Sequence, residues 1–384
     1  MSDFSIFWIA VIFVAINGLT QLAWAAQLGF KLKPTAFAYF FGAVANLLTG
    51  NVVPISGQSA TLTISTFQKN VNERVASILI SSVVMIVLGF FGVVSNLVDF
   101  AGPPVILGMI AGVGILVSQI SFTMLQQEKR TGIISFVAAL LVFWLFVGNP
   151  HQLVYVVGLS VLIASLDFAL LQKRTVQLNK LSEYKCDDGS QVTESDEWRA
   201  WKKEYWQEFK IMKPKFTPSS IYYAFSFMCI ILGTNIAFGR ITAGMTGGRH
   251  PLNVDHLTII SNMADFFSAL FGGVPLEPII SATAASPLPI LAGSVMMALC
   301  GILLLFNIIK RIVTYVPAQS IAGFLFIIGF FATFRPNLMN AINTGYPTQA
   351  LLALLVTVMT KNPFLGLVAG ILVRYIGVHF GLPA

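Results

Sequence analysis

The fold of this chain is decided by the stretch Ser268-Ala-Leu-Phe-Gly-Gly-Val-Pro-Leu-Glu-Pro-Ile-Ile-Ser-Ala-Thr-Ala-Ala-Ser286. An apolar segment runs into a pair of glycines, is interrupted by Pro275 and Pro278, and resumes in small residues, with Glu277 inside the interruption. In a hydrophobic chain this pattern is typical of a discontinuous membrane helix, because unwound backbone persists at membrane depth only where it is buried in protein or lines a cavity. An acid at that depth costs about 2.5–3.5 kcal/mol, which favours a functional role for Glu277. The alternative is an ordinary turn between helices that leaves Glu277 among the lipid headgroups.

A second stretch, Leu48-Thr-Gly-Asn-Val-Val-Pro54-Ile-Ser-Gly-Gln58-Ser-Ala-Thr61, has the same order of an apolar segment, glycine, valine, proline and then small or hydroxyl-bearing residues. Pro54 and Pro275 lie about 220 residues apart, which is the spacing expected of two similar halves in a chain of 384 residues. Interrupted segments at matching positions of two halves are the best sequence indication of a transporter's binding site.

Two pairs of glycines support the repeat. Gly108 and Gly114 follow a Pro-Pro pair, Gly323 and Gly329 follow Pro317, and the members of each pair are six residues apart. The pairs fall at comparable places in the two halves, although glycine and proline are common in membrane helices.

The composition is that of an integral membrane protein. Hydrophobic residues make up 56% of the chain and charged residues only 10%, whereas soluble domains carry about 25% charged residues. Continuous apolar segments of helical length exclude a β-barrel, and we expect a multi-pass protein of the cell (plasma) membrane. The net charge of +7 requires no nucleic-acid partner, since Lys and Arg outside the helices commonly set membrane orientation. The few cysteines and histidines are scattered, so we expect no metal site and no cofactor.

Apolar segments divide the chain into two halves. About seven segments precede residue 171 and about seven follow residue 217, which predicts an all-α polytopic fold of about 14 transmembrane segments. The predicted units are a first repeat at 1–171, a hydrophilic linker at 172–216 and a second repeat at 217–384. Basic residues of the first half place the linker in the cytoplasm and the N-terminus outside, whereas those of the second half give little support.

Two short motifs resemble the nucleobase–cation symporter (nucleobase–ascorbate transporter) superfamily. Ala269-Leu-Phe-Gly-Gly-Val-Pro275 is similar to the run before that family's tenth helix, and Asn17-Gly-Leu-Thr-Gln-Leu22 stands where the family's first helix has Gly-Leu followed by Gln-His. The chain also looks like the hypoxanthine/guanine and xanthine-uracil permease branch. The resemblance implies 7+7 inverted repeats, a cytoplasmic N-terminus in conflict with the charge pattern, and possible homodimerisation.

The same resemblance implies a division into two domains. The core domain would comprise 1–100 and 217–311, and the gate domain 101–171 and 312–384. The third and tenth helices of such a fold are half-length and meet at the middle of the membrane.

The chain departs from the family's pattern at two positions. The family usually carries an acid in its eighth helix, but segment 221–238 has none and Asn235 is its strongest polar candidate. The family's tenth-helix glutamate would fall near Ser281 or Ala282, whereas Glu277 follows Pro275 by only two residues. The carboxylates that bind purines in the family therefore cannot simply be transferred to this chain.

The candidate substrate-binding residues come from the two interruptions and from the helices that the resemblance places beside them. Two half-helices after Pro54 and Pro275 would direct backbone N–H groups at a shared cavity. The candidates are Gln21, Gln58, Ser59, Asn235, Glu277, Ser281 and Thr283. The competing interpretation is structural, because small hydroxyls and amides routinely join membrane helices by hydrogen bonds.

Two acids are candidates for proton coupling. Glu277, in apolar surroundings, would bind a proton together with the substrate and release it inside, because burial disfavours the charged carboxylate. Asp265 is the second acid within an apolar segment, and structural pairing competes with coupling as its role.

These observations predict a secondary transporter that couples uptake of a purine nucleobase or related heterocycle to a proton or another ion. The alternative is a small-anion carrier similar to the sulfate permeases. The helices contain no nucleophile–base pair or metal constellation of an enzyme, and the chain has no Gly-x-x-x-x-Gly-Lys-Ser/Thr motif for ATP. We therefore expect a carrier that is not an enzyme, with a small-molecule substrate, a coupling ion and the lipid bilayer as its partners.

Overall fold

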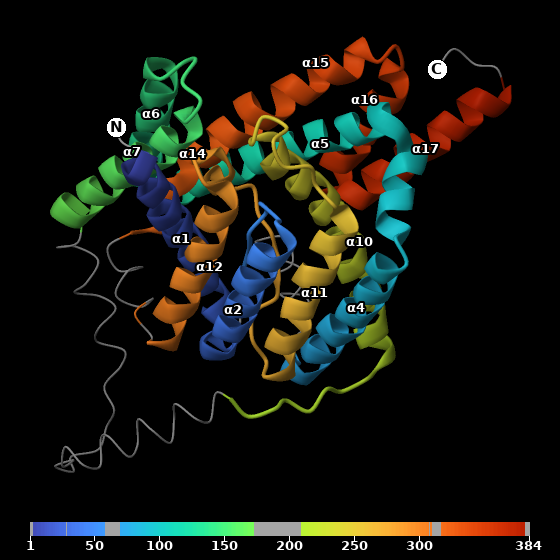
Figure 1. Ribbon diagram of the computed structural model, residues 1–384, viewed down its shortest axis with the longest axis horizontal. Coiled ribbons are helices and arrows are strands. Elements are labelled where there is room, and N and C mark those ends of the chain that lie inside the picture. Colours follow the sequence, from blue (N-terminus) through green and yellow to red (C-terminus); the bar gives the residue numbers. More distant parts are fainter. Residues whose placement is uncertain are drawn as a thin grey trace.

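The computed structural model describes residues 3–27, 29–57, 70–172, 209–306, 308 and 316–380. Helices dominate these residues (Figure 1). The first half contains α1 (Asp3–Gln27), α2 (Leu32–Thr49), β1 (Ile55–Gly57), α4 (Val71–Phe90), α5 (Val93–Gln127), α6 (Lys129–Leu145), α7 (Gln152–Asp167) and the π-helix η1 (Phe168–Gln172). The second half contains α10 (Pro218–Gly244), α11 (Val254–Leu270), β2 (Leu276–Pro278), the 3₁₀-helix η3 (Ala282–Ala285), α12 (Pro289–Leu305), the 3₁₀-helix η4 (Ala318–Ile321), α14 (Ala322–Phe326), the π-helix η5 (Ile327–Phe334), α15 (Arg335–Asn343), α16 (Pro347–Thr360) and α17 (Pro363–Phe380).

The described helices confirm a multi-pass membrane protein. Five of them, counting consecutive helical elements together, are long and apolar enough to cross a bilayer. Large apolar side chains such as Phe90, Leu145 and Met359 are exposed on the outside of the bundle. In water such surfaces would promote aggregation, whereas in a bilayer they contact lipid.

The order of elements repeats between the halves. Helix α2 leads into β1 and then α4, and α11 leads into β2, η3 and α12. The strands β1 and β2 pair with each other in antiparallel fashion, so the two interrupted segments run in opposite directions, as expected for inverted repeats.

The helices form two groups (Figure 1). Helix α2 packs extensively against α12, and α4 against both α10 and α11. In the other group α16 packs against α5 and α17, and α6 against α7. Figure 1 shows α2, α4, α10, α11 and α12 together, with α5, α15, α16 and α17 across one end of them. The division into core and gate domains remains a prediction.

The structure corrects the predicted half-helix after Pro275. This segment forms the strand β2, then the four-residue turn η3, and a regular helix begins only at Pro289. Pro278 lacks an N–H group, and the Ile279 N–H donates to the carbonyl oxygen of Pro54 at 3.0 Å. Because the other half satisfies the backbone here, no helix is needed. The matching segment after Pro54 is described only as far as Gly57, and its predicted half-helix lies outside the described residues.

Two consecutive helices of the first half are separated by a short turn. Helix α4 ends at Phe90 and α5 begins at Val93. Gly92, with φ 67°, makes the turn between them. Helix α5 then continues through Pro103 and Pro104 because Gly102, at φ 75° and ψ 165°, allows a kink just before them.

The end of the hydrophilic linker is described from Phe209 onward. Its backbone lies along the core, with the Met212 N–H donating to Leu270 at 2.8 Å and the Lys215 N–H donating to Asn72 at 3.0 Å. The segment therefore joins the end of α11 to the start of α4.

Candidate substrate site at the crossing of the two halves

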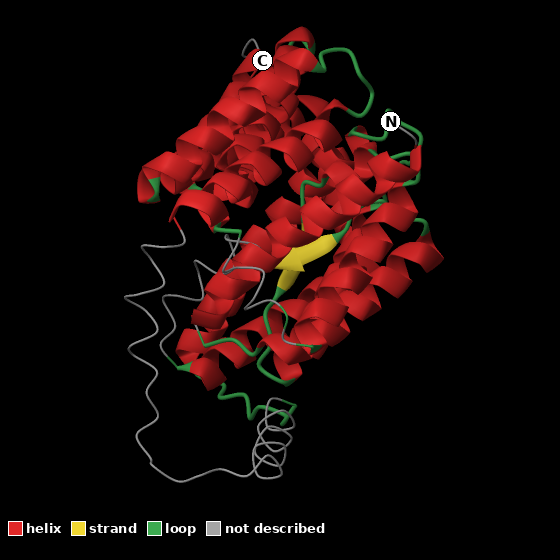
Figure 2. Cartoon of the chain, turned by 90° about the vertical axis from the view of Figure 1, so that its left-hand side faces the viewer, coloured by secondary structure: helices red, strands yellow, loops and turns green. Residues whose placement is uncertain are grey.

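The two interrupted segments meet in a short two-stranded sheet inside the bundle (Figure 2). Ile55 lies opposite Pro278, Ser56 opposite Glu277, and Gly57 opposite Leu276. All six residues are buried. Non-helical backbone thus lies in the protein interior, which is the arrangement that the two interruptions in the sequence predicted.

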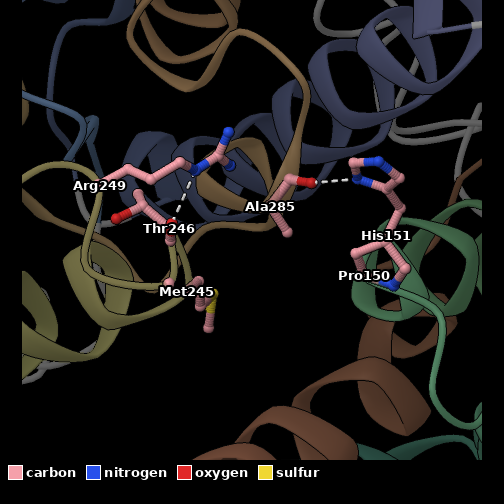
Figure 3. A pocket seen from close by; sticks show the side chains of 7 residues that line it. Pro150, His151, Met245, Thr246, Arg249 and Ala285 are labelled. Carbon is pink, nitrogen blue, oxygen red and sulfur yellow. Dashed lines mark hydrogen bonds between the residues drawn. The ribbon is translucent and has the colours of Figure 1, made fainter.

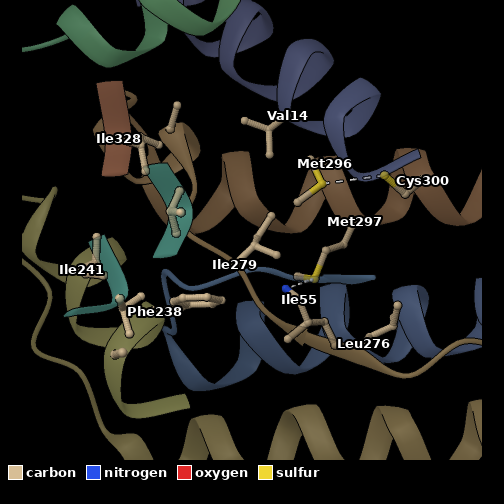
Figure 4. Close-up of a cluster of buried hydrophobic side chains, with 14 of the residues drawn as sticks. Val14, Ile55, Phe238, Ile241, Leu276, Ile279, Met296, Met297, Cys300 and Ile328 are labelled. Carbon is tan, nitrogen blue, oxygen red and sulfur yellow. Dashed lines mark hydrogen bonds between the residues drawn. The ribbon is translucent and has the colours of Figure 1, made fainter. Parts of the chain in front are cut away.

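We call the paired strands β1 and β2 the crossing. Side chains of neighbouring helices form hydrogen bonds with the backbone N–H groups around it. The Leu276 N–H donates to a carboxylate oxygen of Asp265 on α11, and the Val274 N–H donates to the Thr35 hydroxyl of α2 at 2.8 Å. The Ile55 N–H faces the sulfur of Met297 at 3.4 Å, within a cluster of buried apolar residues (Figure 4). The crossing is therefore held from several helices at once.

Ser56 and Glu277 define the polar face of the crossing. The Ser56 hydroxyl lies 2.6 Å from the Tyr39 hydroxyl, and a Cβ added to Gly18 of α1 would lie 2.5 Å from the Ser56 oxygen. Directly opposed residues of antiparallel strands project to the same face, so Ser56 and Glu277 share one face of the strand pair. Glu277 is 1% exposed. We take this face as the candidate substrate site.

The segment that follows β2, residues 279–285, is compact, and we call it the second arm of the site. The Thr242 hydroxyl of α10 donates to the carbonyl oxygen of Ile279 at 2.8 Å, and the Ser281 and Thr283 hydroxyls lie 2.7 Å apart. The Ser281 oxygen also accepts the Thr283 N–H and so caps η3. Both side chains are fully buried, and in this conformation their hydroxyls bond within the arm. Their role toward substrate remains a prediction.

Asn235 joins two helices. Its side-chain nitrogen donates to the hydroxyls of Thr258 at 3.1 Å and Ser261 at 3.4 Å, which ties α10 to α11. The structure thus gives Asn235 helix-joining bonds, and substrate binding by this residue also remains a prediction.

Three other predicted residues are not placed by the structure. Gln58 and Ser59 lie outside the described residues. The backbone of α1 includes Gln21, but the described side chains do not.

Sequence reasoning missed Tyr39, Thr242 and Thr35, each of which bonds the crossing or its arms. A buried tyrosine usually needs a partner for its hydroxyl, so Tyr39 inside an apolar segment was a signal that could have been used. The partner itself comes from another segment and is visible only in the structure.

A cavity of about 530 Å³ opens beside the second arm (Figure 3). Its walls come from the α6–α7 turn, the loop after α10 and the end of η3. The lining residues are Pro150, His151, Met245, Thr246, Gly247, Arg249 and Ala285. Thr246 is one helical turn beyond Thr242, and Ala285 is two residues beyond Thr283, so the cavity adjoins the arm. We call this cavity the vestibule.

The described side chains include no group of three His, Cys, Asp or Glu residues placed to hold a metal ion. The site offers hydroxyl groups and the carboxylates of Glu277 and Asp265 at the crossing, with two basic side chains in the vestibule. This arrangement suits reversible binding of a small polar molecule.

No family model matches the chain, and no curated protein matches its sequence. The transmembrane domain of BicA, a bicarbonate transporter of a cyanobacterium, is similar over 96% of this chain and 98% of its own, with 11% identity and a TM-score of 0.48. SLC26A9 is similar over 98% of this chain, with 13% identity and a TM-score of 0.48, and this chain spans 65% of its length.

Proposed function

We propose that this chain is a secondary transporter that binds a small anion at the crossing of β1 and β2 and carries it together with a proton on Glu277. The observation that carries the proposal is the position of Glu277, buried and directly opposite Ser56 where the two halves meet. Buried acids inside membrane proteins commonly belong to substrate or proton pathways. The protein is proposed to act as a carrier and not as an enzyme.

The choice of an anion over a purine rests on how the other polar groups are used. Asp265 accepts a backbone N–H of the crossing, and the Asn235 amide donates to hydroxyls of α11, so in this conformation both side chains make structural hydrogen bonds. Arg249 and His151 line the vestibule, and the seven lining residues include no acid. Basic walls raise the local concentration of anions.

Coupling to a proton follows from the charge of Glu277. An anion about 4 Å from an ionised carboxylate is repelled by about 4 kcal/mol at an effective dielectric constant of about 20. Protonation removes this repulsion and gives the carboxyl group a hydrogen-bond donor. Anion and proton would therefore bind together and leave together.

A purine nucleobase is the second candidate. The observation in its favour is Glu277 itself, because a carboxylate is an acceptor for the N–H groups of a heterocycle. This candidate needs no proton on Glu277 to admit the substrate.

Uptake into proteoliposomes tests the choice. Labelled sulfate, bicarbonate and hypoxanthine would each be offered with an inward proton gradient, and bicarbonate is included because BicA is described as its transporter. We expect the gradient to drive uptake of one of the anions and not of hypoxanthine, with protein-free liposomes as the control. Uptake of hypoxanthine without uptake of any anion would overturn the proposal.

A further inference from the structure

The vestibule brings together parts of the chain that are distant in sequence. His151 comes from the α6–α7 turn, Arg249 from the loop between α10 and α11, and Ala285 from η3. Figure 3 shows Arg249 extended along one side of the cavity and His151 on the opposite side, with Ala285 between them. The two basic side chains therefore face one space.

His151 connects the α6–α7 turn to the second arm of the substrate site. Its Nδ1 lies 2.6 Å from the carbonyl oxygen of Ala285. A carbonyl can only accept, so Nδ1 carries the hydrogen in this contact. The turn is thereby fixed to η3, the element that also contains Thr283.

Arg249 is held in place by its own loop. Its Nε donates to the carbonyl oxygen of Thr246 at 2.9 Å, and Thr246 is itself buried. This bond directs the guanidinium along the cavity wall. A guanidinium binds an oxyanion through several N–H groups at once.

We propose that the vestibule captures a small inorganic oxyanion between Arg249 and His151, and that capture strengthens the hydrogen bond from His151 to Ala285. The nature of the ligand rests on the proposed function. The capture step is distinct from binding at the crossing, because none of the lining residues belongs to the β1–β2 pair.

The coupling follows from the two charges. An oxyanion bound beside the imidazole favours its protonated form, because the two opposite charges attract each other. Once His151 is protonated, both ring nitrogens are donors and the Nδ1 bond to Ala285 becomes charge-assisted. An oxyanion would therefore fix the α6–α7 turn more firmly to η3.

The described residues that line the vestibule include one charged side chain besides His151, that of Arg249. The four residues of η3 and the neighbours Asn149 and Pro150 contain no titratable side chain. His250 follows Arg249 in the loop but does not line the cavity, so it serves as a control.

The test is sulfate binding to purified full-length protein in detergent, measured as thermal stabilisation across a sulfate titration at about pH 6 and about pH 8. All variants would carry Glu277→Gln, so that Glu277 does not titrate. We expect tighter sulfate binding at the lower pH. Arg249→Gln should weaken binding about tenfold at both values, and Arg249→Lys should weaken it less. His151→Gln should abolish the pH dependence, whereas His250→Gln should preserve it.

Arg335 provides a second control, because it is exposed on α15 and does not line the vestibule. Arg335→Gln should leave sulfate binding unchanged. Met245→Glu, which adds a negative charge to the vestibule wall, should weaken binding without removing either basic group. Unchanged sulfate affinity in both Arg249→Gln and Met245→Glu would overturn the capture site, and pH dependence that persists in His151→Gln would overturn the coupling to His151.

Transport separates this inference from the proposed function. If the chain carries sulfate with the same KM in Arg249→Gln as in the wild type, and sulfate stabilisation is also unchanged, the capture site is wrong and the transporter proposal stands. If the chain carries hypoxanthine and no anion while sulfate still binds through Arg249, the proposed function is wrong and the capture site stands.

Discussion

Gly114 and Gly329 lie against each other at the contact between α5 and η5. A Cβ on Gly114 would be 2.6 Å from the carbonyl oxygen of Gly329, and a Cβ on Gly329 would be 2.7 Å from that of Gly114. The contact is reciprocal, as expected where two inverted repeats meet on their local axis. Each residue is the second glycine of one of the two repeated pairs. The repeated glycines of the sequence therefore lie where two backbones approach closely.

The first glycines of the pairs show the same relationship. A Cβ on Gly108 would be 2.0 Å from the carbonyl oxygen of Ala350 on α16, and one on Gly323 would be 2.1 Å from that of Ser135 on α6. Each half thus packs a glycine against a backbone carbonyl of the other half.

Replacing Gly114 with alanine should therefore destabilise the protein. The new methyl group would meet backbone atoms that cannot rotate away, and overpacking of this kind costs about 1–3 kcal/mol. Thermal unfolding of the purified variant measures the loss. Gly244→Ala in α10, where a Cβ meets nothing within 4 Å, is the matched control and should be neutral or slightly stabilising. A Gly114→Ala variant as stable as this control would contradict the close contact.

Glu277→Gln should remove proton coupling. The amide of glutamine does not bind or release a proton at the pH of a transport assay, so anion uptake should no longer respond to an inward proton gradient. Exchange of labelled for unlabelled anion should persist. In the wild type, uptake should rise as the external solution is made more acidic. Asp99→Asn, at an exposed acid of α5, should behave like the wild type. Retention of gradient-driven uptake in Glu277→Gln would assign the proton to another group.

Asp265 should prove structural, because its carboxylate accepts the Leu276 N–H of the crossing. Asparagine retains an acceptor oxygen, so Asp265→Asn should keep the pH dependence of transport and lose less stability than Asp265→Ala. The alanine variant leaves the buried N–H without this acceptor and should lose about 1.5–3 kcal/mol. Unfolding and uptake measured on both variants separate the roles. Loss of the pH response in a stably folded Asp265→Asn protein would instead support coupling.

The pairing of Ser56 with Glu277 predicts a specific crosslink. Opposed residues of antiparallel strands have Cα atoms about 4.5–5.5 Å apart, which falls within the range that a disulfide spans. In a protein whose native cysteines are replaced, Ser56→Cys with Glu277→Cys should form an intramolecular disulfide under mild oxidation. Mass spectrometry of proteolytic fragments would detect it. The pair Ser56→Cys with Thr283→Cys, not opposed in the sheet, should crosslink far less, and equal yields would argue against the register.

At the crossing, the sequence predicted part of the structure but not all of it. The Gly and Pro residues around Pro54 and Pro275 predicted two interrupted segments, because they disfavour a continuous helix, and their matching positions in the two halves predicted that the segments face each other. They did not predict that the segments pair as strands. That outcome depends on hydrogen bonds such as Ile279 to Pro54, which join residues of opposite halves.

The candidate site shows the same limit. Burial of Glu277 and Asp265 follows from the apolar sequence around them, but their different surroundings do not. Asp265 meets the Leu276 N–H only because α11 folds back along β2, and Glu277 lies opposite Ser56 only because of the strand register. The sequence by itself indicates where a helix is interrupted and which segments are apolar, because both are local properties of the residues. Which side chain meets which backbone group, and how Arg249 and His151 come to share one cavity, was decided by packing between segments far apart in the chain.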